Sequence, residues 1–343
     1  MEKNYQKVVV EEFGGPEQMV LQVLRPLSPG PDQLGIKVEA AGVGMTDVVA
    51  VKGDYILQRN VPFTPGYELV GTVAVLGSNV SGFSVGQRVA VVLPKMGAYT
   101  EYCLVDAWQA VQVPGGLSAT EVAGMLLNYL TAESMLARHA KNLRTGDAVL
   151  IQGAAGGVGD ALCQLARLRE LKVYATASAK DIPFLEATYG VVGIDYTSQD
   201  FASVVASREP HGAQAVFDHL GGKNLTKSYG ILAQNGVLVS YAFMGRPGHA
   251  IADTIGGVLR NKLLGLLPGK RTALCSLPNE IKKDHEWYRL SIEKMFNLLG
   301  EAKIMPRIGR TYPFVEVVAA CTAQASRQVS GKIVLQMSQT QNF

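Results

Sequence analysis

The stretch VLIQGAAGGVGDALCQLA, residues 149–166, decides the fold of this chain. An apolar run leads into closely spaced glycines, and apolar residues then recur at helical spacing. This order of strand, glycine loop and helix is typical of a dinucleotide fingerprint, because glycines allow a tight turn and a close approach of the backbone to a pyrophosphate. The helix N-terminus adds free N–H groups and the positive end of its dipole. The alternative is a purely structural glycine turn. We expect cofactor contacts from Ala155, Gly156, Gly157, Val158 and Gly159.

The segments around this stretch predict an α/β fold. Strands and helices alternate on both sides of it, with the apolar strands KVYATA, AVFDHLG and GVLVSYAF after it. Buried strands joined by helical crossovers indicate a doubly wound parallel sheet. Residues 1–115 read instead as short strands separated by glycine and proline, which predicts an all-β unit, a compact and partly open barrel. The change comes near residue 117, where Ser118 and Glu121 form a capping box ahead of an apolar helix.

Composition excludes several classes of protein. The chain has 343 residues, of which 48% are apolar and 18% charged, with a net charge of +3. This charge is too small for a nucleic-acid footprint, and no apolar run is long enough for a membrane span. The N-terminus lacks the apolar core of a signal peptide, and the four cysteines form no CxxC pair. We expect a cytoplasmic protein with reduced thiols, a small-molecule substrate and no nucleic-acid partner.

The second strand of the α/β part, in KVYATASAK, selects the cofactor. An NAD site places an aspartate or glutamate about 20 residues past the glycines, where it binds the ribose 2′-hydroxyl. Here the place holds Ser178 and Lys180. A hydroxyl and a cation suit a 2′-phosphate, which an acid would repel. The sequence therefore favours NADP.

Nearly the whole chain resembles the medium-chain dehydrogenase/reductase superfamily, and within it the zinc-independent quinone oxidoreductase and enoyl reductase branch. The motifs are AAGVGMTDVVAVKGDY, PFTPGYELVGTV, LNYLTAESML, FDHLGG and the terminal GKIVL, together with the glycine loop. The resemblance implies a GroES-like β-rich catalytic domain over residues 1–119 with 271–343. It also implies an inserted Rossmann domain over residues 120–270, an active site in the cleft between the domains, and a homodimer.

The resemblance also bears on metal. Zinc members carry a cysteine and a histidine where this chain has Gly44 and Tyr67, and neither residue can replace a thiolate or an imidazole. No histidine lies in the first 115 residues. We therefore expect no metal. Without a Lewis acid, nothing lowers the pKa of an alcohol hydroxyl for oxidation, whereas hydride addition to a polarised quinone or enone remains possible.

The matched motifs supply the remaining candidate residues. Tyr55 matches a tyrosine that lines the substrate cleft and donates a proton in some reductases, with a packing role as the alternative. Tyr67 fills the place of the missing ligand and is the second candidate catalytic residue, with a role in lining the site or filling space as the alternative. Many zinc-free relatives have asparagine at the position of Gly44, so a wider cleft is expected here. Further cofactor contacts are expected at Asn128, Thr131, Tyr196, Leu220, Tyr241 and Lys332.

Together these observations predict an NADPH-dependent reductase of quinones or α,β-unsaturated carbonyl compounds. A second hypothesis is a pathway-specific tailoring enoyl reductase of fatty-acid or secondary metabolism. A third, of a different class, is a nucleotide-binding scaffold protein with little catalysis. The glycine loop is compatible with all three, so the sequence alone does not choose the substrate.

Overall fold

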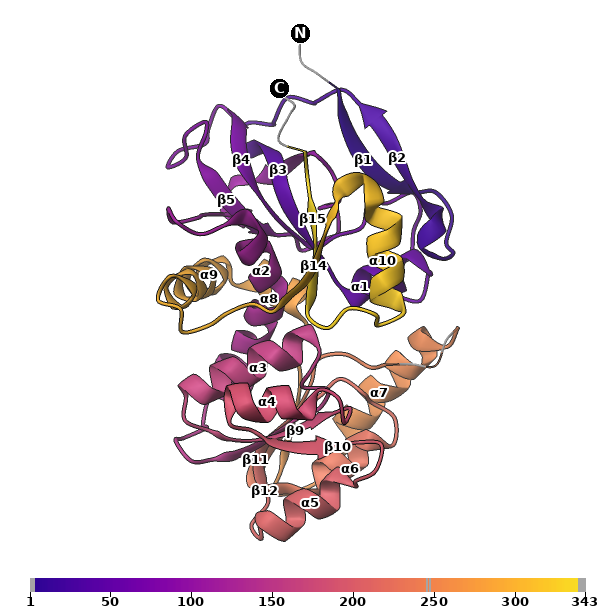
Figure 1. Cartoon of the computed structure of the whole chain (residues 1–343), viewed down its shortest axis with the longest axis vertical. Coiled ribbons are helices and arrows are strands. Elements are labelled where there is room, and N and C mark those ends of the chain that lie inside the picture. The colour runs from indigo at the N-terminus through magenta and orange to yellow at the C-terminus, as the bar shows by residue number, and fades with distance from the viewer. Residues whose placement is uncertain (1–3, 245, 247, 339–343) are drawn as a thin grey trace. The chain divides into compact units, whose positions relative to one another are not determined.

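The computed structural model describes residues 4–244, 246 and 248–338 (Figure 1). The chain divides into two compact units. The first comprises Met1–Leu130 with Pro278–Phe343, and the second comprises Thr131–Leu277. The second unit is thus continuous in sequence, whereas the first is assembled from both parts of the chain that flank it.

The first unit is built on a seven-stranded sheet. The strand order is β14-β15-β3-β4-β5-β7, with β6 paired to β3 off this path. Strand β15 pairs antiparallel with β3, so Figure 1 shows a yellow C-terminal strand next to the indigo and purple strands of the N-terminal part. Two further strands, β1 and β2, form a separate antiparallel ladder. The strands are β1 (Tyr5–Val10), β2 (Met19–Leu24), β3 (Gln33–Val43), β4 (Glu68–Leu76), β5 (Arg88–Val92), β6 (Tyr102–Asp106), β7 (Ala110–Gln112), β14 (Ile308–Pro313) and β15 (Lys332–Gln336).

Two elements of this unit differ from the sequence prediction. Residues 1–115 are not purely β, because helix α1 (Met45–Val51) follows β3. The β-branched valines of α1 favour a strand. A helix forms instead because the Asp47 carboxylate accepts the Gly44 N–H at the helix start. The buried side of α1 then packs with α10 (Val317–Ala325) in the core. The second is strand β14 at residues 308–313, for which the sequence analysis named no strand and which pairs parallel with β15.

The helix predicted after residue 117 begins at its predicted capping box. The amide of Glu121 donates to the Ser118 hydroxyl at 3.2 Å, and the Ser118 amide donates to the Glu121 carboxylate at 3.3 Å, so the predicted capping box is present. It opens α2 (Ala119–Ser134), which crosses the boundary between the units. Helices α8 (Leu277–Lys283) and α9 (His285–Gly300) complete the set.

The second unit contains the predicted doubly wound sheet. Its six strands are parallel in the order β10-β9-β8-β11-β12-β13. The order reverses between β8 and β11, which is the switch point where ligands bind in such sheets. The strands are β8 (Ala148–Ile151), β9 (Lys172–Ala177), β10 (Val192–Asp195), β11 (Ala213–Asp218), β12 (Leu232–Ser240) and β13 (Arg271–Leu274). The helices are α3 (Gly157–Leu168), α4 (Ile182–Tyr189), α5 (Phe201–Arg208), α6 (Asn224–Gly230) and α7 (Ala250–Leu264).

Each unit has an apolar core of its own. In the first unit, buried side chains of the sheet pack with those of α1 and α10. In the second, the sheet packs with α5 and α6. Within the described part of the chain, none of the helices combines the length and the apolar character that crossing a membrane would require.

Candidate functional site

The glycine loop follows β8 and lies at the switch point of the parallel sheet. Gly153 has a φ of +64°, which favours glycine because it has no Cβ. A Cβ on Gly159 would lie 2.4 Å from the Gly153 carbonyl oxygen and 2.7 Å from the Ala154 Cα. The loop therefore folds back onto the first turn of α3 so closely that only glycine fits at residue 159.

The N-terminus of α3 is open. Its N-cap residue is Gly156, which offers no side chain to accept the first N–H groups of the helix. Gly157, Val158 and Gly159 form the first turn, and Gly156 is exposed. An anion placed there gains several N–H donors and the positive end of the helix dipole. This part of the structure fits the pyrophosphate of a dinucleotide, because the glycines leave room and the helix offers donors.

Two side chains hold the loop in shape, and the sequence analysis missed both. The Gly153 N–H donates to the Thr176 hydroxyl at 2.9 Å, and that hydroxyl donates to Gln152 Oε1 at 2.8 Å. Both side chains are buried. Thr176 lies on β9, which pairs with β8 in the sheet. The expected pairing of these two parallel strands could have predicted that Thr176 lies near the loop after β8. The loop is thus fixed before any ligand binds.

A histidine that the sequence analysis did not single out lies over the same loop. His219 directly follows β11, and a Cβ on Gly153 would lie 2.3 Å from His219 Cε1. The Tyr241 hydroxyl lies 3.3 Å from His219 Nδ1. The structure therefore groups Tyr241 with the glycine loop. Leu220 is fixed beside it, because its N–H donates to the buried Asp218 carboxylate at 2.8 Å.

The residues that were expected to select the cofactor follow β9. Lys180 is exposed, and so is Tyr196, which is 58% accessible. The Ser178 hydroxyl donates to Asp181 Oδ2 at 2.6 Å. Asp181 is an acid that the sequence analysis overlooked, because it lies one turn beyond the expected place. A serine, a lysine and an aspartate therefore share this end of β9.

The other expected cofactor contacts lie on α2 and β15. Asn128 and Thr131 are both 9% exposed on α2 and fall on opposite sides of the boundary between the units. Lys332 belongs to the first unit, where its ammonium group forms an ion pair with Glu68. Both side chains of this pair are buried, with 6% and 1% exposure. The Lys332 backbone N–H donates to the Arg307 carbonyl at 2.7 Å.

The first unit brings together the two tyrosines that the sequence analysis proposed as catalytic. The Tyr67 hydroxyl donates to the Tyr55 hydroxyl at 3.2 Å, and the two rings meet edge to face at a centroid distance of 6.3 Å. Burial raises the pKa of Tyr67 far above its usual value. Burial also raises the pKa of Tyr55, although the hydrogen bond from Tyr67 opposes this effect. Both phenols therefore stay neutral at physiological pH.

A buried carboxylate supports the turn that carries Tyr67. Asp47 accepts the N–H of Gly44 at 2.8 Å, the N–H of Gly66 at 3.2 Å and the hydroxyl of Tyr99 at 2.9 Å. Burial raises the pKa of Asp47 to about 6, while the hydrogen bond from Gly44 opposes this rise. Asp47 thereby ties the start of α1 to the residue that precedes Tyr67.

The Glu68–Lys332 ion pair joins β4 to β15 directly beneath Gly42. A Cβ on Gly42 would lie 2.2 Å from Glu68 Oε1 and 2.7 Å from Lys332 Cε. Glu68 Oε2 also accepts the Leu127 N–H at 2.5 Å. A buried charge is tolerated when it is paired and hydrogen-bonded in this way. Glu68, the residue after Tyr67, therefore has a structural role.

Comparison with known proteins places the chain in a family. Residues 30–138 match the alcohol dehydrogenase GroES-like domain, and residues 185–335 match the zinc-binding dehydrogenase domain. The synaptic vesicle membrane protein VAT-1 homolog of Mus musculus is 32% identical over 96% of this chain and 82% of its own length. The chain belongs to the medium-chain dehydrogenase/reductase superfamily. It is an oxidoreductase of that superfamily.

Two further relatives broaden this comparison. A 2-haloacrylate reductase of a Burkholderia species is 31% identical over 95% of this chain and 97% of its own length. A mycobacterial protein solved in complex with NADPH is 28% identical, with a TM-score of 0.81, and the match covers 97% of this chain and 99% of that one. The predicted combination of a GroES-like and a Rossmann domain is therefore confirmed, as is the predicted superfamily.

The donor set of the first unit does not fit zinc, although the matched domain is described as zinc-binding. Zinc in such a site takes cysteine, histidine or carboxylate ligands in a tetrahedron. Gly44 has no side chain, and the Tyr67 hydroxyl is engaged with Tyr55. Asp47 already accepts three hydrogen bonds, and Glu68 is paired with Lys332. These residues cannot build the coordination shell.

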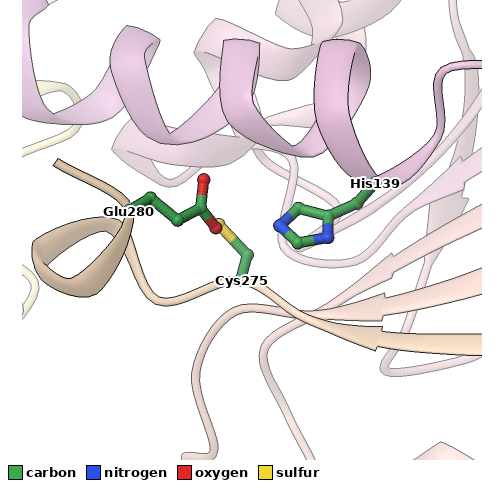
Figure 2. Close-up of side chains that lie close together, drawn as sticks. All are labelled: His139, Cys275 and Glu280. Atoms are coloured by element: carbon green, nitrogen blue, oxygen red, sulfur yellow. The ribbon is translucent and has the colours of Figure 1, made fainter. Parts of the chain in front are cut away.

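Figure 2 shows the potential metal ligands elsewhere in the chain, His139, Cys275 and Glu280. His139 and Cys275 belong to the second unit, and their ligand atoms lie within 4.8 Å of each other. Glu280 belongs to the first unit. One histidine and one cysteine are fewer than the three or four protein ligands of a zinc site, so this pair by itself is not a metal centre.

Proposed function

We propose that this oxidoreductase is a zinc-independent, NADPH-dependent reductase that transfers hydride to a quinone or an α,β-unsaturated carbonyl compound. The observation that carries the proposal is the Tyr67–Tyr55 hydroxyl pair, in which Tyr67 has the sequence position that the resemblance gives to a histidine ligand in zinc members. Neutral phenols cannot lower the pKa of an alcohol as a Lewis acid does. They can hydrogen-bond a carbonyl oxygen, which suits an acceptor that is already polarised.

We assign a different role to each tyrosine. With the Tyr55 hydroxyl accepting the hydrogen of Tyr67, its own hydrogen is left for the substrate. Donated to the carbonyl oxygen, this hydrogen stabilises the negative charge that develops there on reduction. Since burial keeps both phenols protonated, the donor is present across the neutral pH range. Tyr67 is then the residue that orients Tyr55.

The second unit supports nucleotide binding. The residues of the glycine loop and the open N-terminus of α3 would hold the pyrophosphate, and Ser178 with Lys180 would meet the adenosine 2′-phosphate. The nicotinamide, when bound, supplies the hydride. Asp181 opposes a 2′-phosphate, but its carboxylate accepts the Ser178 hydroxyl, and Lys180 beside it adds a positive charge.

The proposal is tested by following loss of NADPH absorbance in metal-free buffer with benzoquinone, phenanthrenequinone, hexenal and crotonyl-CoA as acceptors. Each acceptor is also tested with NADH. We expect turnover on one class of acceptor, a clear preference for NADPH and no loss of rate on chelation. Binding of NADPH without reduction of any acceptor would contradict the proposal and favour a nucleotide-binding scaffold protein. Reduction of crotonyl-CoA alone would point to a tailoring enoyl reductase.

We also propose that the chain forms a homodimer through the second unit. Strand β13 lies at an end of the parallel sheet, and an edge strand offers backbone N–H and C=O groups for pairing with another chain. Leu259 and Leu263 of α7 are 57% and 65% exposed. A second copy of the chain can cover both features at once. Sedimentation should give a dimer mass for the parent chain, and Leu263→Glu should shift it toward the monomer.

A further inference from the structure

The first unit contains a pocket of about 520 Å³ that the proposed function does not use. It is lined by β1, β6, the loop after β5 and Lys282 of α8. Neither Tyr55 nor Tyr67 lines it. Small-molecule sites commonly have volumes of about 300 to 1,000 Å³, so a compact ligand would fit.

The charge of the pocket is positive. Lys7, Lys95 and Lys282 line it, and none of them forms an ion pair within the described part of the chain. Among the described lining residues, Asp106 supplies the one carboxylate, and its Oδ1 accepts the Gln33 side-chain amide at 3.2 Å. Three ammonium groups around a concave surface attract anions, because the low-dielectric wall focuses their field.

Cys103, which also lines the pocket, leaves this balance unchanged. Burial raises the pKa of its thiol to about 12, and Lys7 opposes the rise. The thiol is therefore neutral at physiological pH and presents an apolar, polarisable surface. It adds no negative charge to offset the three lysines.

The walls of the pocket are aromatic and fixed. The rings of Tyr5 and Tyr102 lie 5.6 Å apart at 59°, and both side chains are buried. The Tyr102 hydroxyl donates to the Leu27 carbonyl at 3.1 Å. Trp108 stacks on His285 at a centroid distance of 3.6 Å, so its ring is held in place. Rigid aromatic walls bind flat ligands at little cost in side-chain entropy.

We propose that this pocket binds a small aromatic anion, with its ring against Tyr5, Tyr102 and Trp108 and its carboxylate, sulfonate or phosphate among the three lysines. A flat ring uses the aromatic walls, and an anionic group uses ammonium ions that form no ion pair with the described residues. The pocket is formed by residues of the first unit, and neither tyrosine of the Tyr55–Tyr67 pair is among them.

The probe for the test is anilinonaphthalene sulfonate, a fluorescent aromatic anion. The full chain is used with saturating NADP⁺, so that the dye cannot occupy the nucleotide site. Of the two tryptophans, Trp108 lines the pocket and Trp287 does not. In a Trp287→Phe background, binding in the pocket should quench the single remaining tryptophan by energy transfer to the dye.

Lys282 and Lys283 provide a matched pair for the test, because they are exposed neighbours on α8 and only Lys282 lines the pocket. Lys282→Gln should weaken dye binding about three- to fivefold, as expected for one exposed charge contact, and Lys283→Gln should leave it unchanged. Lys7→Gln should act like Lys282→Gln, and added salt should weaken the binding.

Three outcomes would overturn the proposal. The first is an equal effect of Lys282→Gln and Lys283→Gln, which would mean that only the overall charge matters. The second is dye fluorescence without quenching of Trp108, which would place the dye elsewhere, for example on the exposed leucines of α7. The third is displacement of the dye by the acceptor that the enzyme reduces, which would make the pocket part of the acceptor site.

Discussion

The two units build their candidate sites from different materials. In the second unit the site consists mostly of backbone, namely the glycine loop and the open end of α3. In the first unit it consists of side chains, with a pair of tyrosines on a turn held by a buried carboxylate. A backbone site depends on which residues leave space, whereas a side-chain site depends on which atoms are present. Variants should therefore separate the two sites cleanly.

The largest effect is expected at Tyr55. Tyr55→Phe removes the hydroxyl that we propose to donate to the acceptor oxygen, and kcat should fall about 100-fold, at the lower end of general-acid effects. Nucleotide affinity, measured by quenching of NADPH fluorescence, should not change because the glycine loop lies in the other unit. Tyr67→Phe should lower kcat less, because the donor remains and only its orientation is lost. Equal turnover in Tyr55→Phe and the parent would refute the assignment.

Gly159→Val should weaken the binding of NADPH, whereas Tyr55→Phe should lower kcat and leave that binding unchanged. The new side chain would collide with the Gly153 carbonyl and the Ala154 backbone, and such overpacking costs about 1 to 3 kcal/mol. NADPH affinity should fall about 10- to 100-fold. Gly256→Ala is the matched control, because a Cβ there has no neighbour within 4 Å. If both variants bound NADPH like the parent chain, the loop would not be the nucleotide site.

A smaller effect is expected on the preference for NADPH over NADH, which depends on the side chains of Lys180 and Asp181 near the glycine loop. Lys180→Ala should lower the preference for NADPH over NADH about fivefold, by loss of one exposed charge contact to the 2′-phosphate. Asp181→Asn should raise the preference, because a negative charge beside the Ser178 hydroxyl is removed. The ratio of kcat/KM for the two cofactors measures both. Movement of the ratio in the same direction in both variants would contradict this division of roles.

The smallest effect concerns the support of the tyrosine turn. Because the folded chain holds the pKa of Asp47 at about 6, above its ordinary value of 3.8, the folded state binds this proton more tightly than the unfolded state. The stability that this group contributes is complete below pH 3.8 and is lost as the pH rises through 6. Tyr99→Phe removes a donor to the carboxylate, so its pKa rises further and the loss extends to higher pH.

Denaturant unfolding of the parent and of Tyr99→Phe across this pH range measures the effect, which should be about 1 kcal/mol for one hydrogen bond. Parallel pH profiles of the two proteins would show that Asp47 is not the titrating group. Tyr312→Phe serves as the control, because its ring packs in the same core, whereas the hydrogen bonds that Asp47 accepts come from Gly44, Gly66 and Tyr99.

The sequence predicted most of what depends on local pattern. The glycine spacing identified the loop, the capping box identified the start of α2, and the alternation of strands and helices identified the parallel sheet. What it missed depends on pairing between distant residues. Thr176 and His219 join the loop only because β9 and β11 flank β8, and β14 forms only because β15 lies beside it. Asp181 was missed because a fixed spacing ignores a side chain one turn away.

The position of β15 has a consequence for synthesis on the ribosome. This strand lies between β14 and β3, and its Lys332 neutralises the buried Glu68 of β4. Until residues 332–336 emerge, β3 keeps an open edge and Glu68 lacks its counter-ion. The second unit, which is continuous, can be folded by then. The nascent chain therefore carries a finished second unit together with an incomplete β sheet of the first unit, and this interval is when chaperones and aggregation compete for it.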